Sequence, residues 1–313
     1  MVEDKEGIMN IISTIVPVFV IIFLGLYAKR RGFFTPDFLD QANRLVYYIA
    51  IPAMIFSSIA KASLKTETHI SVILITLFVL LAIAATAFGL TKVLNMPKPL
   101  KGSFIHSSFH GNLGYIGFAV AFYYLGNKGF VKAAIISGFV MILQNLLAVL
   151  VLQFHSEKNE GGINLMSTLK KTMANPVIVS ALAGILVAFF NIPIPEIIDR
   201  SLDILKGLAL PMALLIIGAS LSFQNLKPRF IHAGITTFLK LFLAPAIGLV
   251  LFKLFSIRPD DYLPAMIVLA SPTATLTYIM AKEIGGDPDF AVAVISISTL
   301  ISSVTYGFWL TLG

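Results

Sequence analysis

The chain has 313 residues, of which 57% are apolar and only 12% are charged. An average soluble domain is about 25% charged, so this composition excludes an ordinary soluble protein and indicates a polytopic protein of the lipid bilayer. The net charge of +7 does not indicate a nucleic-acid partner, because Lys and Arg gather in the loops between apolar segments. Cysteine is absent, so no thiolate metal site is predicted, and neither a metal nor a cofactor is expected.

The apolar segments predict ten transmembrane helices. About 20 apolar residues span a bilayer, and on that measure the spans cover residues 8–28, 42–60, 70–91, 103–125, 131–154, 173–190, 203–222, 230–254, 262–281 and 289–311. The longest loop is polar and lies at the midpoint. It divides the chain into a first half, residues 1–154, a cytoplasmic linker, residues 155–172, and a second half, residues 173–313.

The charges of the loops predict the orientation in the membrane. The side that holds the odd-numbered loops carries 13 Lys and Arg residues, and the other side carries 9. Cytoplasmic loops hold the excess of positive charge. The odd loops are therefore predicted to lie in the cytoplasm and both termini outside, in a multi-pass protein of the cytoplasmic membrane.

The two halves of the chain repeat. Pro17 and Pro52 recur 159 residues later as Pro176 and Pro211. Each half has an odd number of predicted spans, so the two halves must enter the membrane from opposite sides. An inverted-topology repeat of two five-helix units is typical of secondary transporters.

The fourth and ninth spans are both interrupted near their middle. In the fourth, a His, an Asn and three glycines fall within His110–Gly117, and glycine lowers the cost of leaving helical geometry. In the ninth, Pro272 is followed by a run of hydroxyl residues. Interrupted helices at corresponding positions indicate a binding site. Because the start of a half-helix presents unpaired N–H groups and a positive dipole end, the predicted ligand is an anion.

At these residues the chain resembles the auxin efflux carrier family, which includes plant auxin exporters and bacterial permeases for small carboxylates. The resemblance runs from about Ile8 to Gly313 and rests on the ten spans, the repeat and several short motifs. The motifs are Ala281-Lys282-Glu283, Asp287-Pro288-Asp289, Asn175-Pro176, Ile51-Pro52 and Gln144.

The resemblance implies an all-α fold of two inverted five-helix repeats. Helices 4 and 9 would cross as broken helices, as in bile acid transporters and sodium/proton antiporters, and one bundle would move against the other in an elevator-like cycle. It also implies that Asn112 and Asn175 contact the substrate carboxylate, that Ile51 lines the pocket, and that the protein forms a homodimer.

The chain departs from the plant members at both breaks. His110-Gly111-Asn112 stands where the plant carriers have Leu-Pro-Asn, and Thr273 stands where they have Gln. The central loop has 18 residues, whereas the plant loop is often very long. These differences favour a small carboxylate over the plant indole acid.

Several candidate residues of the substrate site could instead have a purely structural role. Asn112 and Asn175 could cap helices, and Thr273 could bond to its own backbone. Pro272 is expected mainly to cause the break. The remaining expected site residues are Gly111, Gly114 and Gln144.

Two ionisable residues within the predicted spans are candidates for coupling. His110 could carry protons or be a neutral hydrogen-bonded residue. Lys240, in the middle of the eighth span, could take part in coupling or gating, or its ammonium could reach the membrane surface. Asp and Glu are confined to loops and helix ends. Proton symport and facilitated transport driven by the membrane potential therefore both stay open.

The sequence thus predicts a secondary transporter, and not an enzyme, for a small organic anion such as malonate, malate or an auxin-like acid. The alternatives are an anion channel, and a membrane sensor or scaffold without transport. A channel needs a continuous polar path, and a sensor is expected to carry a signalling domain.

Overall fold

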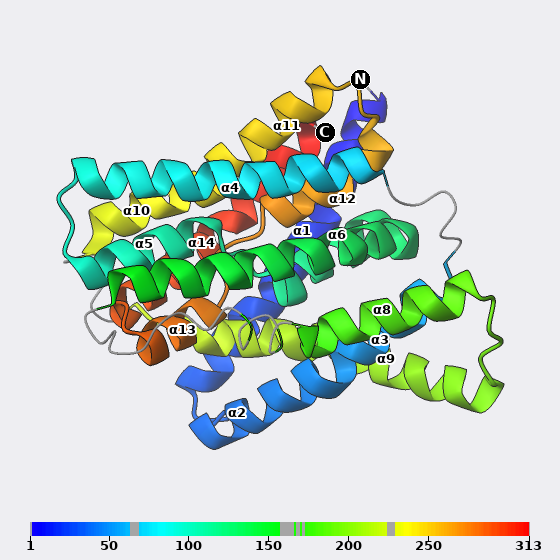
Figure 1. The fold of residues 1–313 in the computed structure, drawn as a ribbon. Helices are drawn as coiled ribbons and strands as arrows, with labels where there is room; N and C mark the ends of the chain where they lie inside the picture. Colours follow the sequence, from blue (N-terminus) through cyan, green and yellow to red (C-terminus); the bar gives the residue numbers. More distant parts are fainter. Residues whose placement is uncertain are drawn as a thin grey trace.

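The structure is a computed structural model that describes residues 2–62, 69–156, 166, 170, 173–223 and 229–312. Every regular element within these residues is helical (Figure 1). The helices are α1 (Val2–Arg30), α2 (Pro36–Leu45), α3 (Ile51–Ala60), α4 (Ile70–Val93), α5 (Lys98–Phe109), α6 (Phe118–His155), α8 (Pro176–Phe189), α9 (Glu196–Ser220), α10 (Phe230–Phe238), α11 (Ala244–Leu254), α12 (Pro259–Leu269), α13 (Leu276–Ile284) and α14 (Pro288–Leu312). Three π-helical turns, Val46–Ala50, Leu113–Gly117 and Leu239–Leu243, precede α3, α6 and α11.

Seven helical stretches of the described residues are long and apolar enough to cross a membrane, where the sequence predicts ten. Six of them match the expected first, second, third, seventh, eighth and tenth spans, and the seventh, Leu113–His155, contains the fifth. The expected sixth span is α8, an apolar helix of 14 residues. The expected fourth and ninth spans are each broken. The all-helical, polytopic class is confirmed, whereas the ten-helix inverted repeat stays a prediction.

The predicted division into two halves and a linker also stays a prediction. Most of the linker, residues 155–172, lies outside the described residues. Within the first half, α6 is one helix by its bounds but is bent at Gly126, where φ is +66°. Glycine adopts such a φ without steric cost. The residues before this bend continue the expected fourth span, and those after it form the fifth.

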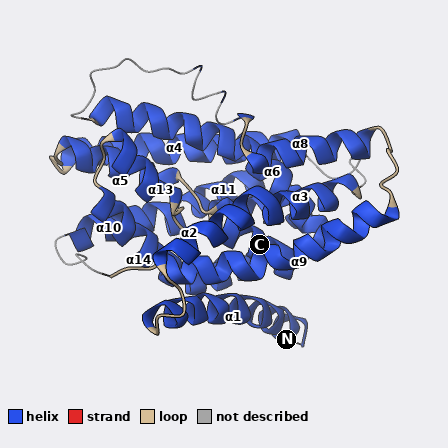
Figure 2. Cartoon of the chain, turned by 90° about the horizontal axis from the view of Figure 1, so that it is seen from below, coloured by secondary structure: helices blue, strands red, loops and turns tan. Residues whose placement is uncertain are grey.

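The helices form two groups that face each other. The first group contains α1, α2, α3, α8 and α9, and the second contains α4, α5, α6 and α10 to α14, with the most extensive packing inside each group. In Figure 1, α3, α8 and α9 lie together below α6, and α4, α10 and α11 lie above it. Figure 2 shows the same division in a second view, with α4, α5 and α10 at one end and α3, α8 and α9 at the other.

Glycines permit the closest helix crossings in the first group. A Cβ atom at Gly25 of α1 would lie 2.1 Å from the carbonyl oxygen of Leu215 in α9. A Cβ atom at Gly184 of α8 would lie 3.2 Å from the carbonyl oxygen of Phe56 in α3. Small residues let helix backbones approach in a membrane. Gly25 and Gly184 are also separated by the repeat offset of 159 residues, so they occupy comparable crossings in the two halves.

Candidate functional site

The two chain breaks meet inside the second group. The α5 helix ends at Phe109, and α12 ends at Leu269. The intervening extended segments pair as a short antiparallel bridge between Gly111 and Thr273. The N–H of Asn112 donates to the carbonyl of Pro272 at 2.7 Å, and the N–H of Ala274 donates to the carbonyl of His110 at 3.0 Å. The broken helices therefore satisfy part of each other's backbone, which buried N–H and C=O groups require.

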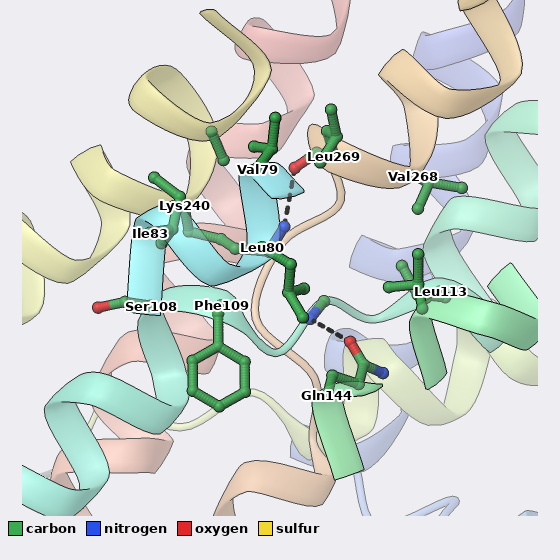
Figure 3. A pocket seen from close by; sticks show the side chains of 13 residues that line it. Val79, Leu80, Ile83, Ser108, Phe109, Leu113, Gln144, Lys240, Val268 and Leu269 are labelled. Carbon is green, nitrogen blue, oxygen red and sulfur yellow. Dashed lines mark hydrogen bonds between the residues drawn. The ribbon is translucent and has the colours of Figure 1, made fainter. Parts of the chain in front are cut away.

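Side chains from neighbouring helices complete the hydrogen bonding where the two breaks pass each other (the crossing, residues 110–112 and 272–274). The N–H of Thr273 donates to Ser298 Oγ of α14 at 3.1 Å, and its hydroxyl donates to the carbonyl of Ser107 at 2.9 Å. The N–H of Gly111 donates to Gln144 Oε1 of α6 at 3.3 Å. Figure 3 shows Gln144 directed at the backbone beside Leu113. The extended geometry is therefore held by the packed helices around it.

Gly111 is required at the crossing for steric reasons. A Cβ atom at this position would lie 2.4 Å from Ser271 Oγ and 3.0 Å from a methyl group of Leu113. Gly114 has more room, because a Cβ atom there would meet only Met141 Cε at 3.9 Å. Of these two glycines, only Gly111 is constrained by such a close approach.

Lys240 lies behind the crossing and stabilises the end of α12. Its side chain is 3% exposed, and its Nζ donates to the carbonyl of Leu269 at 2.8 Å (Figure 3). Leu269 is the last residue of α12, and a cation at a helix C-terminus is favourable because the dipole end there is negative. Lys240 has no carboxylate partner among the described residues. The pocket around it holds about 10 Å³, which is space for about one water molecule.

A much larger cavity, of about 610 Å³, lies between the two helix groups on the other side of the crossing. From the first group it is lined by residues of α2, α3 and α8, and from the second by both breaks, α6 and α13. Its lining contains the starts of two helical segments, at Leu113–Gly117 and at Leu276 of α13. The lining residues are Asn43, Arg44, Tyr47, Tyr48, Ile51, His110, Gly111, Asn112, Leu113, Gly114, Tyr115, Met141, Gln144, Asn145, Asn175, Val177, Ala274, Thr275, Leu276 and Ile279.

The described lining of this cavity has a positively charged side chain and no negatively charged one. Arg44 lines it, and no Asp, Glu or Lys does among the described residues. Arg44 is exposed and forms no ion pair within the described part of the chain. A guanidinium in a cleft without carboxylates attracts anions and presents several fixed donors to a carboxylate.

Three amide side chains in the lining have their oxygens occupied. Asn43 Oδ1 accepts from the hydroxyl of Tyr115, Gln144 Oε1 accepts from the N–H of Gly111, and Asn175 Oδ1 accepts from the N–H of Val177 at 2.9 Å. Their amide nitrogens have no hydrogen-bond partner in the ranges that the structure describes. What these amides offer a ligand is therefore N–H donors.

Two further amides complete the set. Asn112 is 6% exposed, its side chain does not cap the following helical turn, and its Nδ2 is buried without a partner among the described residues. Asn145 differs, because its buried oxygen also has no partner among the described residues. An unpartnered buried N–H group carries a free-energy cost that a ligand acceptor would remove.

The structure brings most of the sequence-predicted site residues to one cavity. Ile51, His110, Gly111, Asn112, Gly114, Gln144 and Asn175 all line it. Pro272, Thr273 and Lys240 do not line it. The hydroxyl of Thr273 and the ammonium of Lys240 donate to backbone carbonyls, and the carbonyl of Pro272 accepts from the N–H of Asn112. Asn175 caps α8, which was one of the two roles considered for it, and it also lines the cavity. Its contact with a substrate stays a prediction.

Sequence reasoning missed Arg44 and the Tyr115–Asn43 pair. Arg44 was counted only among the loop charges, because the second span was predicted to start at residue 42, whereas the helix that contains Arg44, α2, begins at Pro36. The available signal was the apolar spacing that continues back to Phe38, preceded by Thr35 and Pro36. Thr35 is the N-cap, and its hydroxyl accepts from the N–H of Phe38.

No group of three or more His, Asp or Glu side chains within the described ranges could hold a metal ion.

Comparison with known proteins gives a family match over almost the whole chain. The family described as "Membrane transport protein" matches residues 10–310. A Rhizobium meliloti protein named "Putative malonate transporter" is 25% identical over 299 residues, which cover 95% of this chain and 93% of that protein. An uncharacterized transporter of Methanocaldococcus jannaschii is 24% identical, over 93% of this chain and 95% of its own length.

A plant protein matches over a shorter region. Auxin efflux carrier component 7 of Arabidopsis thaliana is 29% identical over 154 residues, which cover 46% of this chain and 24% of the plant protein.

Proposed function

Because the chain belongs to the membrane transport protein family, whose relatives include the auxin efflux carriers, we propose that it is a secondary transporter of a small organic anion. The substrate would be a carboxylate of the size of malonate or malate, or an auxin-like acid. It would cross the cytoplasmic membrane by alternating access, in an elevator-type movement of the second helix group against the first.

The lining of the 610 Å³ cavity carries this proposal. One guanidinium and the amide N–H groups of Gln144 and Asn175 line a space whose described lining holds no carboxylate, and the buried Nδ2 of Asn112, another lining residue, has no described partner. A small anion would exchange its hydration shell for the amide N–H groups, and the guanidinium would attract it at longer range. A cation would find no counter-charge there, and burying it unpaired would be costly.

Neutral donors also suit a carrier, which must release what it binds. Tight charge pairing would slow release, whereas amide N–H groups and helix N-termini hold a carboxylate with partial charges. Ile51 and the neighbouring aromatic residues Tyr47 and Tyr48 would contact the apolar part of the substrate. Thr273 and Pro272 would fix the crossing that positions Asn112.

Uptake into proteoliposomes tests the proposal. Purified protein would be reconstituted with labelled malonate, malate and an indole carboxylate, together with a labelled cation and a neutral sugar as controls. We expect saturable uptake of at least one carboxylate and none of the controls. Equal permeation of the carboxylates without saturation would instead indicate a channel, and no permeation by correctly folded protein would contradict transport of this substrate class.

The same proteoliposomes address the driving force. Uptake would be measured under an imposed membrane potential and, separately, under an imposed pH gradient. If His110 couples protons, His110→Gln removes the response to the pH gradient and preserves the response to the potential. If the pH response is the same in this variant and in the wild type, His110 is not the coupling residue. Lys240→Gln gives the corresponding test for the second candidate.

The predicted orientation and assembly belong to the same proposal. Both termini would lie outside the cytoplasm, and the protein would form a homodimer. Labelling of single cysteines introduced near each terminus tests the first point, because the chain contains no native cysteine. The mass of the purified protein in detergent tests the second.

A further inference from the structure

A buried pair of histidines adjoins the proposed substrate site. His106, in the last turn of α5, and His110, directly after it, are 0% and 1% exposed. Their rings are joined by a hydrogen bond of 2.8 Å between His106 Nε2 and His110 Nδ1. His110 also lines the 610 Å³ cavity, whereas His106 does not.

The two outer nitrogens of this pair have different surroundings. His106 Nδ1 is enclosed and has no partner among the described residues. His110 Nε2 likewise makes no hydrogen bond to a described residue, but it is not among the enclosed atoms. Neither ring has a carboxylate partner in the described part of the chain, where the one histidine–carboxylate contact is that of His69. A charged imidazolium would be costly there, so both rings are considered neutral.

Two neutral rings that share one hydrogen bond have two arrangements. In one, His110 Nδ1–H donates to His106 Nε2, which leaves a protonated His106 Nδ1 buried without an acceptor. In the other, His106 Nε2–H donates to His110 Nδ1, which leaves only an unprotonated nitrogen enclosed. Orphaned buried N–H groups are rarer than under-satisfied acceptors, so the second arrangement is favoured. In that arrangement His110 Nε2 carries the remaining proton.

From this geometry we infer that His110 is a neutral hydrogen-bond donor to the carboxylate of the substrate, next to the Asn112 amide, and that His106 is the positioning residue that sets its tautomer. The inference rests on the proposed transport function for the identity of the ligand. The tautomer itself does not depend on that function. A bound anion would favour the same arrangement, because only a protonated Nε2 can donate to it.

Nitrogen NMR of the wild-type protein in lipid bilayers tests the tautomer without any ligand. Protonated and unprotonated ring nitrogens give well-separated resonances, and histidine labelled only at Nδ1 or only at Nε2 distinguishes the two positions. The His110→Gln and His106→Gln variants assign the signals. We expect a protonated His110 Nε2 and an unprotonated His106 Nδ1. An unprotonated His110 Nε2 overturns the inference, whether or not the protein transports carboxylates.

The contact with substrate is tested with sodium malonate as the probe and with uptake as the second readout. We expect malonate to shift the His110 Nε2 resonance and leave His106 Nδ1 unchanged. His110→Leu should raise KM for malonate about ten-fold or more, since it removes a hydrogen bond to a charged group, and His110→Gln, which can donate, should restore most of the affinity. Equal KM values for the wild type and His110→Leu overturn the contact.

The role of His106 in setting the tautomer of His110 is tested separately. His106→Leu should give a mixture of His110 tautomers in the spectrum and a smaller rise in KM than His110→Leu. A single unchanged His110 tautomer in this variant overturns the role of His106. The matched control is His155→Gln: His155 is also buried, bonds through Nδ1 to the carbonyl of Val151, and lies outside the cavity lining. It should change neither the spectrum of His110 nor KM.

Discussion

At the scale of single residues, the kind of ligand that the cavity can bind depends on which side-chain atoms already form hydrogen bonds within the protein. Asn43, Gln144 and Asn175 each place their oxygen against an internal donor, so their nitrogens remain for a ligand. Asn112 differs because its backbone takes part in the crossing while its side-chain nitrogen has no described partner. An anion is the ligand that such a set of donors binds best.

Asn112→Ala should weaken binding without disturbing the crossing, because the backbone bond to Pro272 does not involve its side chain. Loss of one hydrogen bond to a charged group corresponds to about 1.5–3 kcal/mol, or roughly a 10- to 100-fold rise in KM. Asn112→Asp should be worse, since it places a carboxylate beside the bound anion. Labelled-malonate uptake measures both.

The control for Asn112 is Asn10→Ala, which removes an exposed amide from α1 far along the chain from the cavity lining. It should leave KM unchanged. The same KM in wild type and Asn112→Ala, with both proteins folded, would remove Asn112 from the site.

Arg44→Gln should raise KM several-fold at low salt, and Arg44→Lys should restore most of the loss. Arg44 is exposed at the cavity, and a charge in that position acts mainly by attracting the anion at long range. Salt screens such an effect over about 10 Å at 0.1 M ionic strength. Uptake measured across a range of ionic strength should therefore show the wild type and Arg44→Gln converging at high salt. A deficit in Arg44→Gln that is independent of salt would instead indicate a direct contact.

The residue-level set was only partly predictable from the sequence. Asn175 before Pro176 has the signature of a helix cap, and Asn112 beside a glycine marks a break. Their contact with the substrate is implied by the family resemblance and stays a prediction. Arg44 was missed because the second span was predicted to start only two residues before it, at residue 42, so it was counted with the loop charges. The bond that occupies Asn43 joins it to Tyr115, 72 positions away. No local pattern encodes a contact of that range.

At the scale of helices, the two breaks stabilise each other. Each contributes one backbone donor and one acceptor to the other, and Lys240, Ser298 and Gln144 satisfy groups that remain. The positions of the breaks could be predicted, since glycine and proline act locally. The bonds that complete them could not be predicted, although Gln144 and Lys240 were candidates, because these side chains come from other segments of the chain.

Gly111→Ala should disrupt the crossing, because its Cβ would lie 2.4 Å from Ser271 Oγ. We expect a lower melting temperature and loss of uptake, and we expect the double variant with Ser271→Ala to recover part of both, as coupled neighbours do. The control is Gly138→Ala in α6, where a Cβ meets nothing within 4 Å. It should be neutral or slightly stabilising, by less than about 1 kcal/mol. An unchanged Gly111→Ala variant would mean that the crossing is looser than the structure indicates.

At the scale of the whole molecule, the cavity lies where the two helix groups meet, so movement of one group past the other would expose it to either side in turn. Away from the cavity, the groups also touch where Lys206 of α9 lies 5.3 Å from the ring centre of Phe122 in α6. Within the first group, Lys61 at the end of α3 pairs with Asp199 of α9. This pair holds together helices that the proposal treats as one unit.

Cross-linking these two contacts tests the movement. A covalent link between Phe122→Cys and Lys206→Cys joins the two groups and should stop uptake, and cleavage of the linker should restore it. A link between Lys61→Cys and Asp199→Cys joins two helices of one group and should leave uptake intact. The absence of native cysteine makes both experiments specific. Full uptake with the first link in place would contradict relative movement of the groups.

The most direct test of the account is malonate counterflow. Proteoliposomes loaded with unlabelled malonate would be diluted into a trace of labelled malonate, at zero membrane potential and equal pH on both sides. A carrier with a single alternating site predicts that labelled malonate accumulates transiently inside above its external concentration, and that Asn112→Asp abolishes this overshoot. Simple equilibration without an overshoot in the wild-type protein, or an overshoot unaffected by Asn112→Asp, would contradict it.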